Sequence, residues 1–543
     1  MKHGLFNILI LVVISFIPVR SNSQTVYKVG AGQSYLSVGA VPWENLVAGD
    51  SVKIYWRSAP YKEKWVINRA GQPDKWITII GIPNVSGQLP VIDGQNATTR
   101  NNLNYWGEER GVIKIGGSNV PADGMPCYIH IENLEIRNGR SIYSFTGRNG
   151  VASYSPNAAA IYIEKGENIV IKNCTLTNCG NGFFAAGSKN IIMEGCYLFD
   201  NGNISSAYEH NNYTSSQGII FQYNHFGPLL AGASGNNLKD RSAGTIIRHN
   251  WIESGNRQLD LVDNDSPEIN GLPLYRNTYV YGNILIEPDG AGNSQICHYG
   301  GDSGEEASYR KGTLHFFNNT VVSTRSGNTT LFRLSTNSES VNCFNNILSV
   351  SATGDRLAML DSYGVLNIQN NWLKGNWVNS HSVLSGSVNN LGNNISGTTP
   401  GFVNEVAQDF RLLQESECID KGTTVPVNYP VNSEYVKHQK IIAKNISGLI
   451  DLGAFEYSVQ TSLKPPETNG FILFPNPAHE KVSVICPSFI YKMSLLNFSG
   501  KEFSLIASSG YETDIDLNNF NKGIYLLKLY TETGIILKKL IVN

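Results

Sequence analysis

The sequence predicts an all-β protein whose main part is a solenoid of short strands. A phrase of alternating apolar and polar residues repeats through the middle of the chain, and each copy turns at Asn or Gly. The copies are IVIKNCTL (169–176), IIMEGCYL (191–198), IIFQYNHF (219–226), TIIRHNWI (245–252), YVYGNIL (279–285), LHFFNNTVV (314–322), VNCFNNIL (341–348) and LNIQNNWL (366–373). Repeats of strands and turns at this spacing indicate coils that bury their apolar residues against neighbouring coils.

One slot of the repeat is held first by Cys174 and Cys196 and then by asparagine. The asparagines are Asn224, Asn250, Asn283, Asn319, Asn346 and Asn371. Successive slots lie 22, 28, 26, 33, 36, 27 and 25 residues apart, so the length variation falls between the phrases, as it does for insertions in surface loops. Because asparagine tolerates a left-handed turn and its amide can bond the amide one coil away, we expect an asparagine ladder. The two cysteines are expected to be stacked core thiols.

Composition and the first residues limit the class of protein. Residues 1–23 combine a basic start, an apolar run from Leu5 to Val19 and small polar residues, which is typical of a secretory signal peptide. No later stretch approaches the roughly 20 apolar residues of a membrane helix. A net charge of −2 without a basic block argues against nucleic-acid partners, and eight cysteines in 543 residues are too few for a disulfide scaffold.

The repeat resembles the right-handed parallel β-helix of the pectate-lyase superfamily over roughly residues 25–457. Near the C-terminus, the FPNPA start and the GIYLLKL…KKLIV finish resemble the sorting domain of the type IX secretion system of Bacteroidetes, a small β-sandwich. The expected organisation is a signal peptide (1–23), a catalytic parallel β-helix (24–460), a linker (461–470) and the sorting domain (471–543). This resemblance implies export by the type IX machinery through the periplasm and outer membrane to a secreted or cell-surface location. We expect a monomer.

Ionisable residues gather in the stretch GNNLKDRSAGTIIRHNWIESGNRQLDLVDN (235–264), although the chain is only 16% charged. A second, shorter strand precedes each repeated phrase. These strands are AIYI (160–163), GFFA (182–185), AYEHN (207–211), NNLKD (236–240), QLDLVD (258–263), SQICHY (294–299) and TLFRL (330–334). Stacked about 4.8 Å apart, they would form one sheet whose outward residues are Glu209 or His210, then Lys239, Asp260 and His298.

Such a row, with Arg241 and Arg257 at the bordering strand ends, is the expected form of an active site. Lysine and arginine on a β-helix resemble the chondroitinase B and alginate lyase group, which implies β-elimination of an acidic polysaccharide. In that reaction a base removes the proton α to a uronate carboxylate that a cation has neutralised. Lys239 is the predicted base, because Arg241 and Arg257 nearby would favour its neutral form. His210 or Arg241 is predicted to protonate the leaving oxygen.

Substrate contacts are predicted for Tyr208, Glu209, Asp260 and His298. The acidic segment DLVDNDSPE (260–268) offers Asp260, Asp263 and Asp265 as oxygen ligands, so Ca²⁺ is the one candidate cofactor. The insertions at 264–278 and 299–312 are expected to wall the cleft.

Two other functions stay open from the sequence. A glycoside hydrolase on the same fold would use Asp260 with Asp263 or Glu209 as paired carboxylates. A noncatalytic carbohydrate-binding adhesin would instead present a flat, solvated and dispensable row of charges, in which Lys239 and Asp260 form an ordinary interstrand ion pair.

Overall fold

The computed structural model describes residues 24–437, 439–458, 472–497, 501–505, 510–531 and 534–543. The chain divides into two compact units, one ending at Tyr457 and the other beginning at Ser458. The predicted signal peptide (1–23) and linker (461–470) lie outside the described residues.

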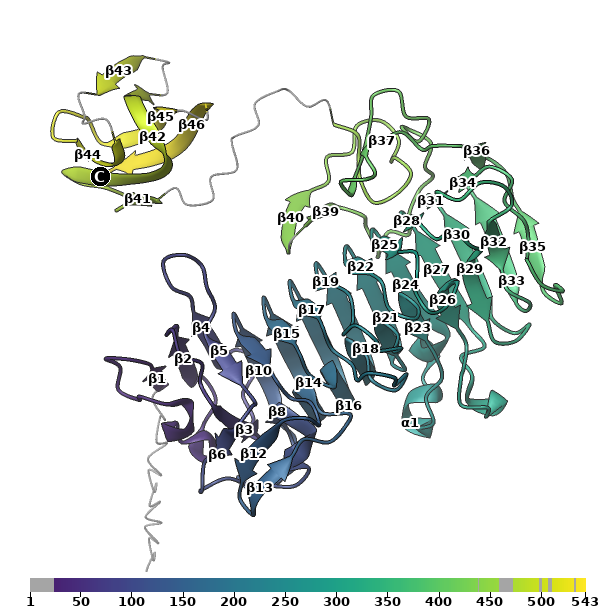
Figure 1. The fold of residues 1–543 in the computed structure, drawn as a ribbon, viewed down its shortest axis with the longest axis horizontal. Helices are drawn as coiled ribbons and strands as arrows, with labels where there is room; N and C mark the ends of the chain where they lie inside the picture. The colour runs from purple at the N-terminus through teal and green to yellow at the C-terminus, as the bar shows by residue number, and fades with distance from the viewer. Residues whose placement is uncertain (1–23, 438, 459–471, 498–500, 506–509, 532–533) are drawn as a thin grey trace, which may run out of the picture. The chain divides into compact units, whose positions relative to one another are not determined.

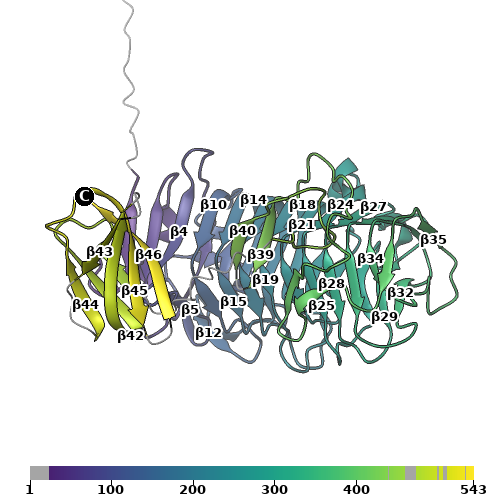
Figure 2. The same ribbon diagram turned by 90° about the horizontal axis from the view of Figure 1, so that it is seen from above.

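The first unit is a parallel β-helix in which each coil contributes strands to three sheets (Figures 1 and 2). One coil, for example, consists of β20 (Leu238–Asp240), β21 (Ala243–Arg248) and β22 (Trp251–Glu253), and the next of β23 (Leu259–Leu261), β24 (Asn277–Tyr281) and β25 (Ile284–Glu287). Each strand pairs in parallel with its counterpart one coil away. The predicted all-β solenoid is confirmed.

The sheet that carries the charged row, called here the site sheet, contains the first strand of each coil. Its strands are β8 (Gly111–Ile115), the first parts of β14 (Ala159–Lys172), β16 (Asn181–Glu194) and β18 (Asn212–Gln222), then β20, β23, β26 (Gln295–Tyr299), β29 (Thr329–Leu334) and β32 (Leu357–Leu360). The second sheet continues with the later parts of β14, β16 and β18, then β21, β24, β27 (Thr313–Phe317), β30 (Ser340–Phe344), β33 (Val365–Gln369) and β35 (Ser387–Asn390). The third comprises β5 (Val91–Asp93), β11 (Glu135–Arg137), β15 (Thr175–Thr177), β17 (Tyr197–Phe199), β19 (His225–Phe226), β22, β25, β28 (Thr320–Ser323), β31 (Ile347–Val350), β34 (Trp372–Lys374) and β36 (Ile395–Gly397).

The N-terminal end of the solenoid is covered, and the segment after the last coil lies along its side (Figure 1). At the N-terminal end, β1 (Val26–Val29), β2 (Ser51–Tyr55), β4 (Ile77–Ile82) and β10 (Cys127–Glu132) pair in sequence, and Trp43 stacks on Trp65 in the core beneath them. After the last coil, the antiparallel pairs β37 (Phe402–Asn404)–β38 (Asp409–Leu412) and β39 (Ser433–Val436)–β40 (Lys440–Ala443) pack Phe410 and Tyr435 against Trp251 of the third sheet.

The asparagine ladder is present inside the solenoid. From Asn250 to Asn371, each side-chain oxygen accepts the backbone N–H and the side-chain N–H of the asparagine one coil before it, at 2.9–3.1 Å. The Asn224 oxygen accepts the backbone N–H of Cys196 at 2.8 Å, and all six asparagines are fully buried. The left-handed backbone belongs to the preceding residue, contrary to the prediction. These residues are Tyr223, His249, Gly282, Asn318, Asn345 and Asn370, with φ between 49° and 66°. Cys174 and Cys196 are buried free thiols, as predicted.

The second unit is antiparallel and has its own apolar core. Its strands are β41 (Ile472–Phe474), β42 (Lys481–Asn497), β43 (Glu502–Leu505), β44 (Gly510–Asp516), β45 (Gly523–Thr531) and β46 (Gly534–Val542). Val484, Leu495, Leu527 and Leu540 are fully buried between them. None of the candidate site residues lies in this unit.

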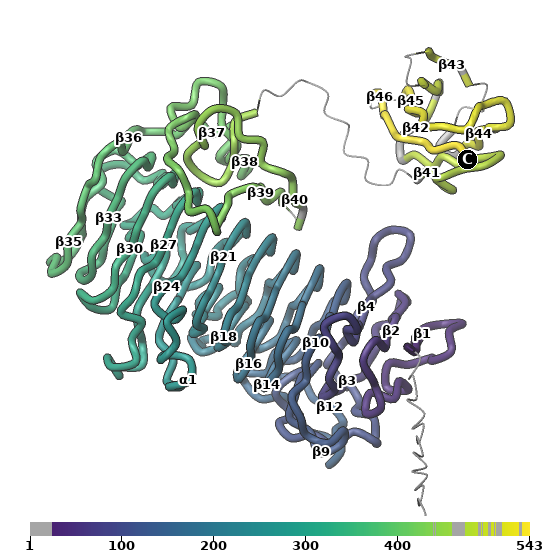
Figure 3. Tube along the Cα trace, turned by 180° about the vertical axis from the view of Figure 1, so that it is seen from behind, coloured from purple at the N-terminus to yellow at the C-terminus, as the bar shows by residue number. Residues whose placement is uncertain are grey.

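Two insertions leave the solenoid where the site sheet turns into the second sheet (Figure 3). The first follows β23 and contains the short helix α1 (Pro267–Asn270) and the 3₁₀ turn η4 (Pro273–Arg276). The second follows β26 and contains η5 (Glu306–Ser308). Arg310, fully buried, ties both insertions to the solenoid, because its guanidinium donates to the carbonyls of Val262 and Ser242 and pairs with buried Asp240 at 3.5 Å.

Candidate active site

Consecutive coils bring one row of polar side chains together on the site sheet. The strand register pairs Tyr213 with Lys239, Lys239 with Asp260, Asp260 with His298, and His298 with Arg333. The predicted juxtaposition of Lys239, Asp260 and His298 is therefore confirmed. Because successive side chains of a strand alternate between its faces, the leucines that flank Lys239 and Asp260 are fully buried on the other side.

The prediction for the position before Lys239 in this row is wrong. The segment 207–211 is a loop, and β18 begins at Asn212, so Tyr213 occupies the position given to Glu209 or His210. The cause is a second asparagine ladder, in which Asn211 bonds Asn201 and Asn237 at 2.9 Å and fixes residue 211 in the turn before the strand. A one-residue shift of register would turn every side chain to the opposite face, so this ladder decides which residue enters the row.

Asp260 is the centre of the row and is 1% exposed. One carboxylate oxygen accepts hydrogen bonds from Lys239 Nζ at 2.6 Å and Asn236 Nδ2 at 2.7 Å, and the other lies 2.9 Å from His298 Nδ1. Burial alone would raise the pKa of Asp260, but the hydrogen bond to His298 and the charge of Lys239 outweigh it and lower the pKa below its ordinary value. Asp260 is thus an ionised anchor for the residues on both sides of it.

The second insertion adds a carboxylate that the sequence analysis missed. Asp302 bridges two cations, with one oxygen 2.5 Å from Lys239 Nζ and the other 2.7 Å from an Arg241 terminal nitrogen. Its pKa is lowered, because the nearby Lys239 outweighs the effect of burial. The predicted surroundings of Lys239 are therefore wrong: the groups that contact its Nζ are the two carboxylates Asp260 and Asp302, not the arginines.

Arg241 and Tyr213 form a pair beside Lys239. Arg241 Nε donates to the Tyr213 hydroxyl oxygen at 3.0 Å. Burial by itself lowers the pKa of the guanidinium, but Tyr213 and Asp302 have the larger combined effect and raise it, so Arg241 stays charged. The Lys239 ammonium lies 6.0 Å from the centre of the Tyr213 ring.

Two neutral histidines belong to the site, His298 within the row and His210 beside it. Burial, followed by the charge of Lys239, lowers the pKa of His210 to about 3. Its Nδ1 accepts the backbone N–H of Asn236 at 2.9 Å, so the ring proton lies on Nε2. Burial also lowers the pKa of His298, whose ring spans Asp260 and the Ser335 hydroxyl, 3.0 Å from Nε2.

These side chains line a cavity of ≈ 620 Å³, called here the first cavity. Its lining includes seven of the predicted residues together with four that the sequence analysis missed. The predicted ones are Tyr208, His210, Lys239, Arg241, Arg257, Asp260 and His298, and the missed ones are Tyr213, Asn236, Asp302 and Arg333. Lys239 is 7% exposed, so the row forms the floor of a cavity and is not the open, solvated stripe that an adhesin would present.

Three predicted carboxylates do not reach the first cavity. Glu209 is 5% exposed and is absent from the lining. Asp263 binds the second insertion, accepting the Asp302 backbone N–H at 2.8 Å and the Ser303 hydroxyl. Asp265 lines a different cavity. The carboxylate set predicted for a hydrolase, Asp260 with Asp263 or Glu209, is thus not assembled.

The predicted calcium site does not fit these residues. Among the described residues, no group of three or more His, Cys, Asp or Glu side chains is arranged to hold a metal ion. Both oxygens of Asp260 and both oxygens of Asp263 already accept hydrogen bonds from protein donors or contact cationic groups. Ca²⁺ requires six to eight oxygen ligands, which Asp260, Asp263 and Asp265 do not offer together.

Acidification is expected to destabilise the β-helix through its buried histidines. Burial lowers the pKa of His249, like that of His210, to about 3, whereas an unfolded histidine has a pKa of about 6.5. Between these values the unfolded state binds more protons than the native state, so stability falls as the pH falls, by about 1.4 kcal/mol per pH unit for each histidine. Thermal unfolding between about pH 6.5 and 4.5 measures this dependence.

The matched variants are His249→Asn and His381→Asn. His249 has a φ of 52°, which asparagine accepts readily, and the variant is expected to weaken the pH dependence by one proton. His381 is exposed, and its replacement is expected to leave the dependence unchanged. An identical pH profile for wild type and His249→Asn would contradict the assignment.

Family models agree with this architecture. Residues 91–285 match the model of the right-handed β-helix region, and residues 472–543 match that of the secretion system C-terminal sorting domain. The protein is a right-handed parallel β-helix with a type IX sorting domain. The sorting domain gives it a secreted or cell-surface location and makes the type IX machinery its export partner. Among the described residues, no helix has the length and apolar content of a membrane span.

No curated protein matches the sequence. Among solved structures, pectate lyase Pel9A is similar over 80% of this chain and 97% of its own, at 12% identity and a TM-score of 0.43. An alginate lyase from Paenibacillus sp. str. FPU-7 is similar over 64% and 95%, at 12% identity and a TM-score of 0.39. A GH136 lacto-N-biosidase from Eubacterium ramulus is similar over 67% and 68%, at 12% identity and a TM-score of 0.35. At these values the similarities carry no information about the reaction.

Proposed function

We propose that this protein is a lyase that cleaves a polysaccharide containing uronic acid by β-elimination. The observation that carries the proposal is the composition of the first cavity. Four cationic side chains, Lys239, Arg241, Arg257 and Arg333, line it against two carboxylates, Asp260 and Asp302. Such a cavity is complementary to an anionic sugar, and β-elimination is the reaction in which the carboxylate of that sugar must be neutralised by cations.

Arg241 is the residue best placed to neutralise the uronate carboxylate. It stays charged, and its side chain lies in the cavity beside Tyr213. Arg333 is exposed at the other end of the row and offers a second guanidinium. Arg257 is held by the Gln295 side chain at 2.7 and 3.1 Å, which orients it toward the cavity it lines. Guanidinium groups suit this role because their planar donors match a carboxylate.

Tyr213 and Lys239 are the proposed proton-transfer residues. Tyr213 is the proposed base: through the oxygen that accepts the Arg241 Nε–H, it takes the proton from C5 of the uronate, and a C4–C5 double bond forms as the C4–O4 bond breaks. The Lys239 ammonium, held by Asp260 and Asp302, gives its proton to the departing O4. This assignment replaces the predicted role of Lys239 as the base, and it leaves His210 to orient substrate through its Nε2–H.

The protonation state of the carboxylates favours a lyase over a hydrolase. Hydrolysis by paired carboxylates needs one of them protonated as the general acid, with its pKa raised. The pKa values of Asp260 and Asp302 are both lowered, so both stay ionised. Neither Glu209 nor Asp263, the other carboxylates considered for that role, lines the cavity.

The proposal is tested by the Tyr213→Phe variant on a panel of acidic polysaccharides. We expect the wild type to generate the ultraviolet absorbance of a conjugated unsaturated uronate, and Tyr213→Phe to lose about 10²- to 10⁴-fold in kcat, as expected for removal of a proton-transfer group. The fold should tolerate the change, because Phe184 holds the same register position one coil earlier.

Tyr208→Phe is the matched control, because Tyr208 also lines the cavity but is 82% exposed in a loop. Tyr208→Phe should raise KM a few-fold and leave kcat unchanged. New reducing ends without ultraviolet absorbance would identify a hydrolase, and binding without any cleavage would identify an adhesin.

A further inference from the structure

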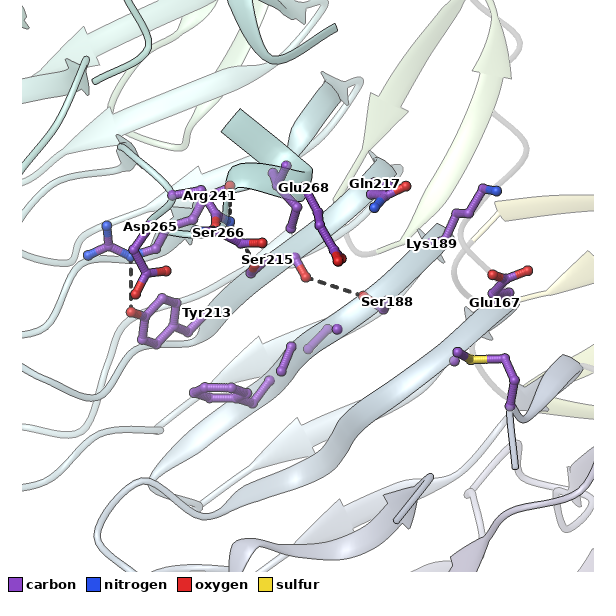
Figure 4. Close-up of a pocket in the computed structure, with 18 residues that line it drawn as sticks. Glu167, Ser188, Lys189, Tyr213, Ser215, Gln217, Arg241, Asp265, Ser266 and Glu268 are labelled. Carbon is purple, nitrogen blue, oxygen red and sulfur yellow. Dashed lines mark hydrogen bonds between the residues drawn. The ribbon is translucent and has the colours of Figure 1, made fainter. Parts of the chain in front are cut away.

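A second cavity adjoins the first on the site sheet. It has a volume of ≈ 490 Å³ and shares Tyr213 and Arg241 with the first cavity. Figure 4 shows these two residues at one end of it and Lys189 and Glu167 at the other, with residues of the first insertion along one side. A polymer whose uronate occupies the first cavity therefore places its neighbouring sugar, past Tyr213 and Arg241, in the second.

The two cavities differ in charge. The first has four cationic side chains against two carboxylates. The second has Lys189 and the shared Arg241 against three carboxylates, Glu167, Asp265 and Glu268. In the part of the chain that the structure describes, none of these three carboxylates forms an ion pair, so their charge is free to act on a ligand. A second carboxylate or a sulfate on the substrate would be repelled there.

The rest of the second cavity suits an uncharged sugar. Its floor includes Phe184, a half-buried ring that packs against Tyr213 with their centroids 5.0 Å apart. Neutral donors and acceptors surround it. They are Ser188, Ser215, Gln217, Asn264 and Ser266. An aromatic face with a few placed hydroxyl and amide groups is the usual composition of a site that orients a ligand by hydrogen bonds.

The wall of the second cavity is fixed in place before any ligand binds. Asn264 Nδ2 donates to the Ser215 hydroxyl at 2.7 Å and to the Arg241 carbonyl at 2.8 Å, which fastens the first insertion to the solenoid. The Asn264 backbone N–H donates to the Tyr275 hydroxyl at 2.7 Å, and its carbonyl accepts from Asn270 at the end of α1. Glu268 of α1 is exposed and is held over the cavity by these contacts.

We propose that the second cavity binds a sugar that carries no negative charge, so that the substrate is a heteropolysaccharide in which uronate alternates with neutral or amino sugars. This inference rests on the proposed lyase function and narrows its substrate class. Homopolymers of uronate are poor substrates, because each would force a carboxylate into the second cavity.

The test compares polymers that share a uronate and differ in the neighbouring sugar. Polyglucuronate is paired with hyaluronan, in which glucuronate alternates with N-acetylglucosamine, and polygalacturonate with a rhamnogalacturonan. In whichever pair is cleaved, we expect kcat/KM for the alternating polymer to exceed that for the homopolymer by about tenfold or more at low salt. The preference should shrink as salt screens the exposed carboxylates.

The Asp265→Asn/Glu268→Gln double variant is expected to reduce this ratio about fivefold, by speeding cleavage of the homopolymer once repulsion is removed. Glu415→Gln, an exposed acid outside both cavities, removes a charge elsewhere and should leave the ratio unchanged. Equal cleavage of both polymers of a pair by the wild type, or an unchanged ratio in the double variant, would overturn the inference.

Failure of the lyase proposal would be seen separately, as the absence of unsaturated product from all four polymers. The affinity of the wild type for the uncut polymers would then test the proposed preference of the second cavity for an uncharged sugar. Tighter binding of the alternating polymers would support the inference, and tighter binding of the homopolymers would overturn it.

Discussion

Replacing Lys239 by methionine is expected to abolish measurable cleavage and to lower the free energy of unfolding by about 3–5 kcal/mol. Methionine keeps much of the side-chain volume but removes the ammonium that contacts Asp260 and Asp302. Asp260, 1% exposed, is then left without its cationic partner, and a buried charge without its partner is costly. The loss of rate follows from the loss of the proposed proton donor.

The double variant Lys239→Met/Asp260→Asn separates the two effects. The neutral amide no longer needs a cation, so we expect a large part of the stability to return while the activity stays absent. Denaturant unfolding and initial rates of cleavage measure the two quantities. If Lys239→Met were as stable as the wild type and cleaved within tenfold of its rate, both the structural and the catalytic role of Lys239 would be contradicted.

Asn283→Ala is expected to destabilise the β-helix by about 4 kcal/mol, although it lies inside the solenoid and away from the first cavity. The Asn283 side chain donates to Ile247, Tyr281 and Asn319, and its oxygen accepts two N–H groups of Asn250. Alanine would remove these bonds and leave the buried Asn250 backbone N–H unsatisfied, at a cost of about 1–3 kcal/mol before any relaxation, in addition to the bonds that Asn283 itself donates.

Asn389→Ala is the matched control. Asn389 also bonds an asparagine one coil away, Asn367, at 3.0 Å, but it is exposed. Water replaces the lost partner there, so the expected change is below about 0.5 kcal/mol. Denaturant midpoints of the two variants should therefore differ widely, and equal midpoints would rule out burial as the reason for the asparagine ladder.

The sequence was sufficient for the solenoid and for part of the site. The repeated phrases set the order of the coils, and strict alternation in NNLKD and QLDLVD placed Lys239 beside Asp260. The same reasoning failed for Tyr213, because the length of the loop before β18 is set by the Asn201–Asn211–Asn237 ladder and not by the repeat. The available signal was an asparagine directly before β18 and β20, namely Asn211 and Asn237.

Contacts made by the insertions had no periodic signal. Asp302 reaches Lys239 and Arg241 only because Asp263 and Arg310 hold the insertions against the site sheet. The calcium prediction counted carboxylates along one segment, whereas the fold gives Asp260 and Asp263 cationic or hydrogen-bonding partners and places Asp265 in a different cavity. Whether an acidic residue can bind a metal ion depends on the groups that contact it in the folded protein, which the sequence alone does not show.

The most direct test of the central claim, that the first cavity catalyses elimination, is the mass of the products from a defined acidic oligosaccharide. Elimination adds no water, so we predict two fragments whose masses sum to that of the intact chain, with the unsaturated residue at the new non-reducing end. A sum greater by one water, with a saturated end, would contradict the account and identify a hydrolase.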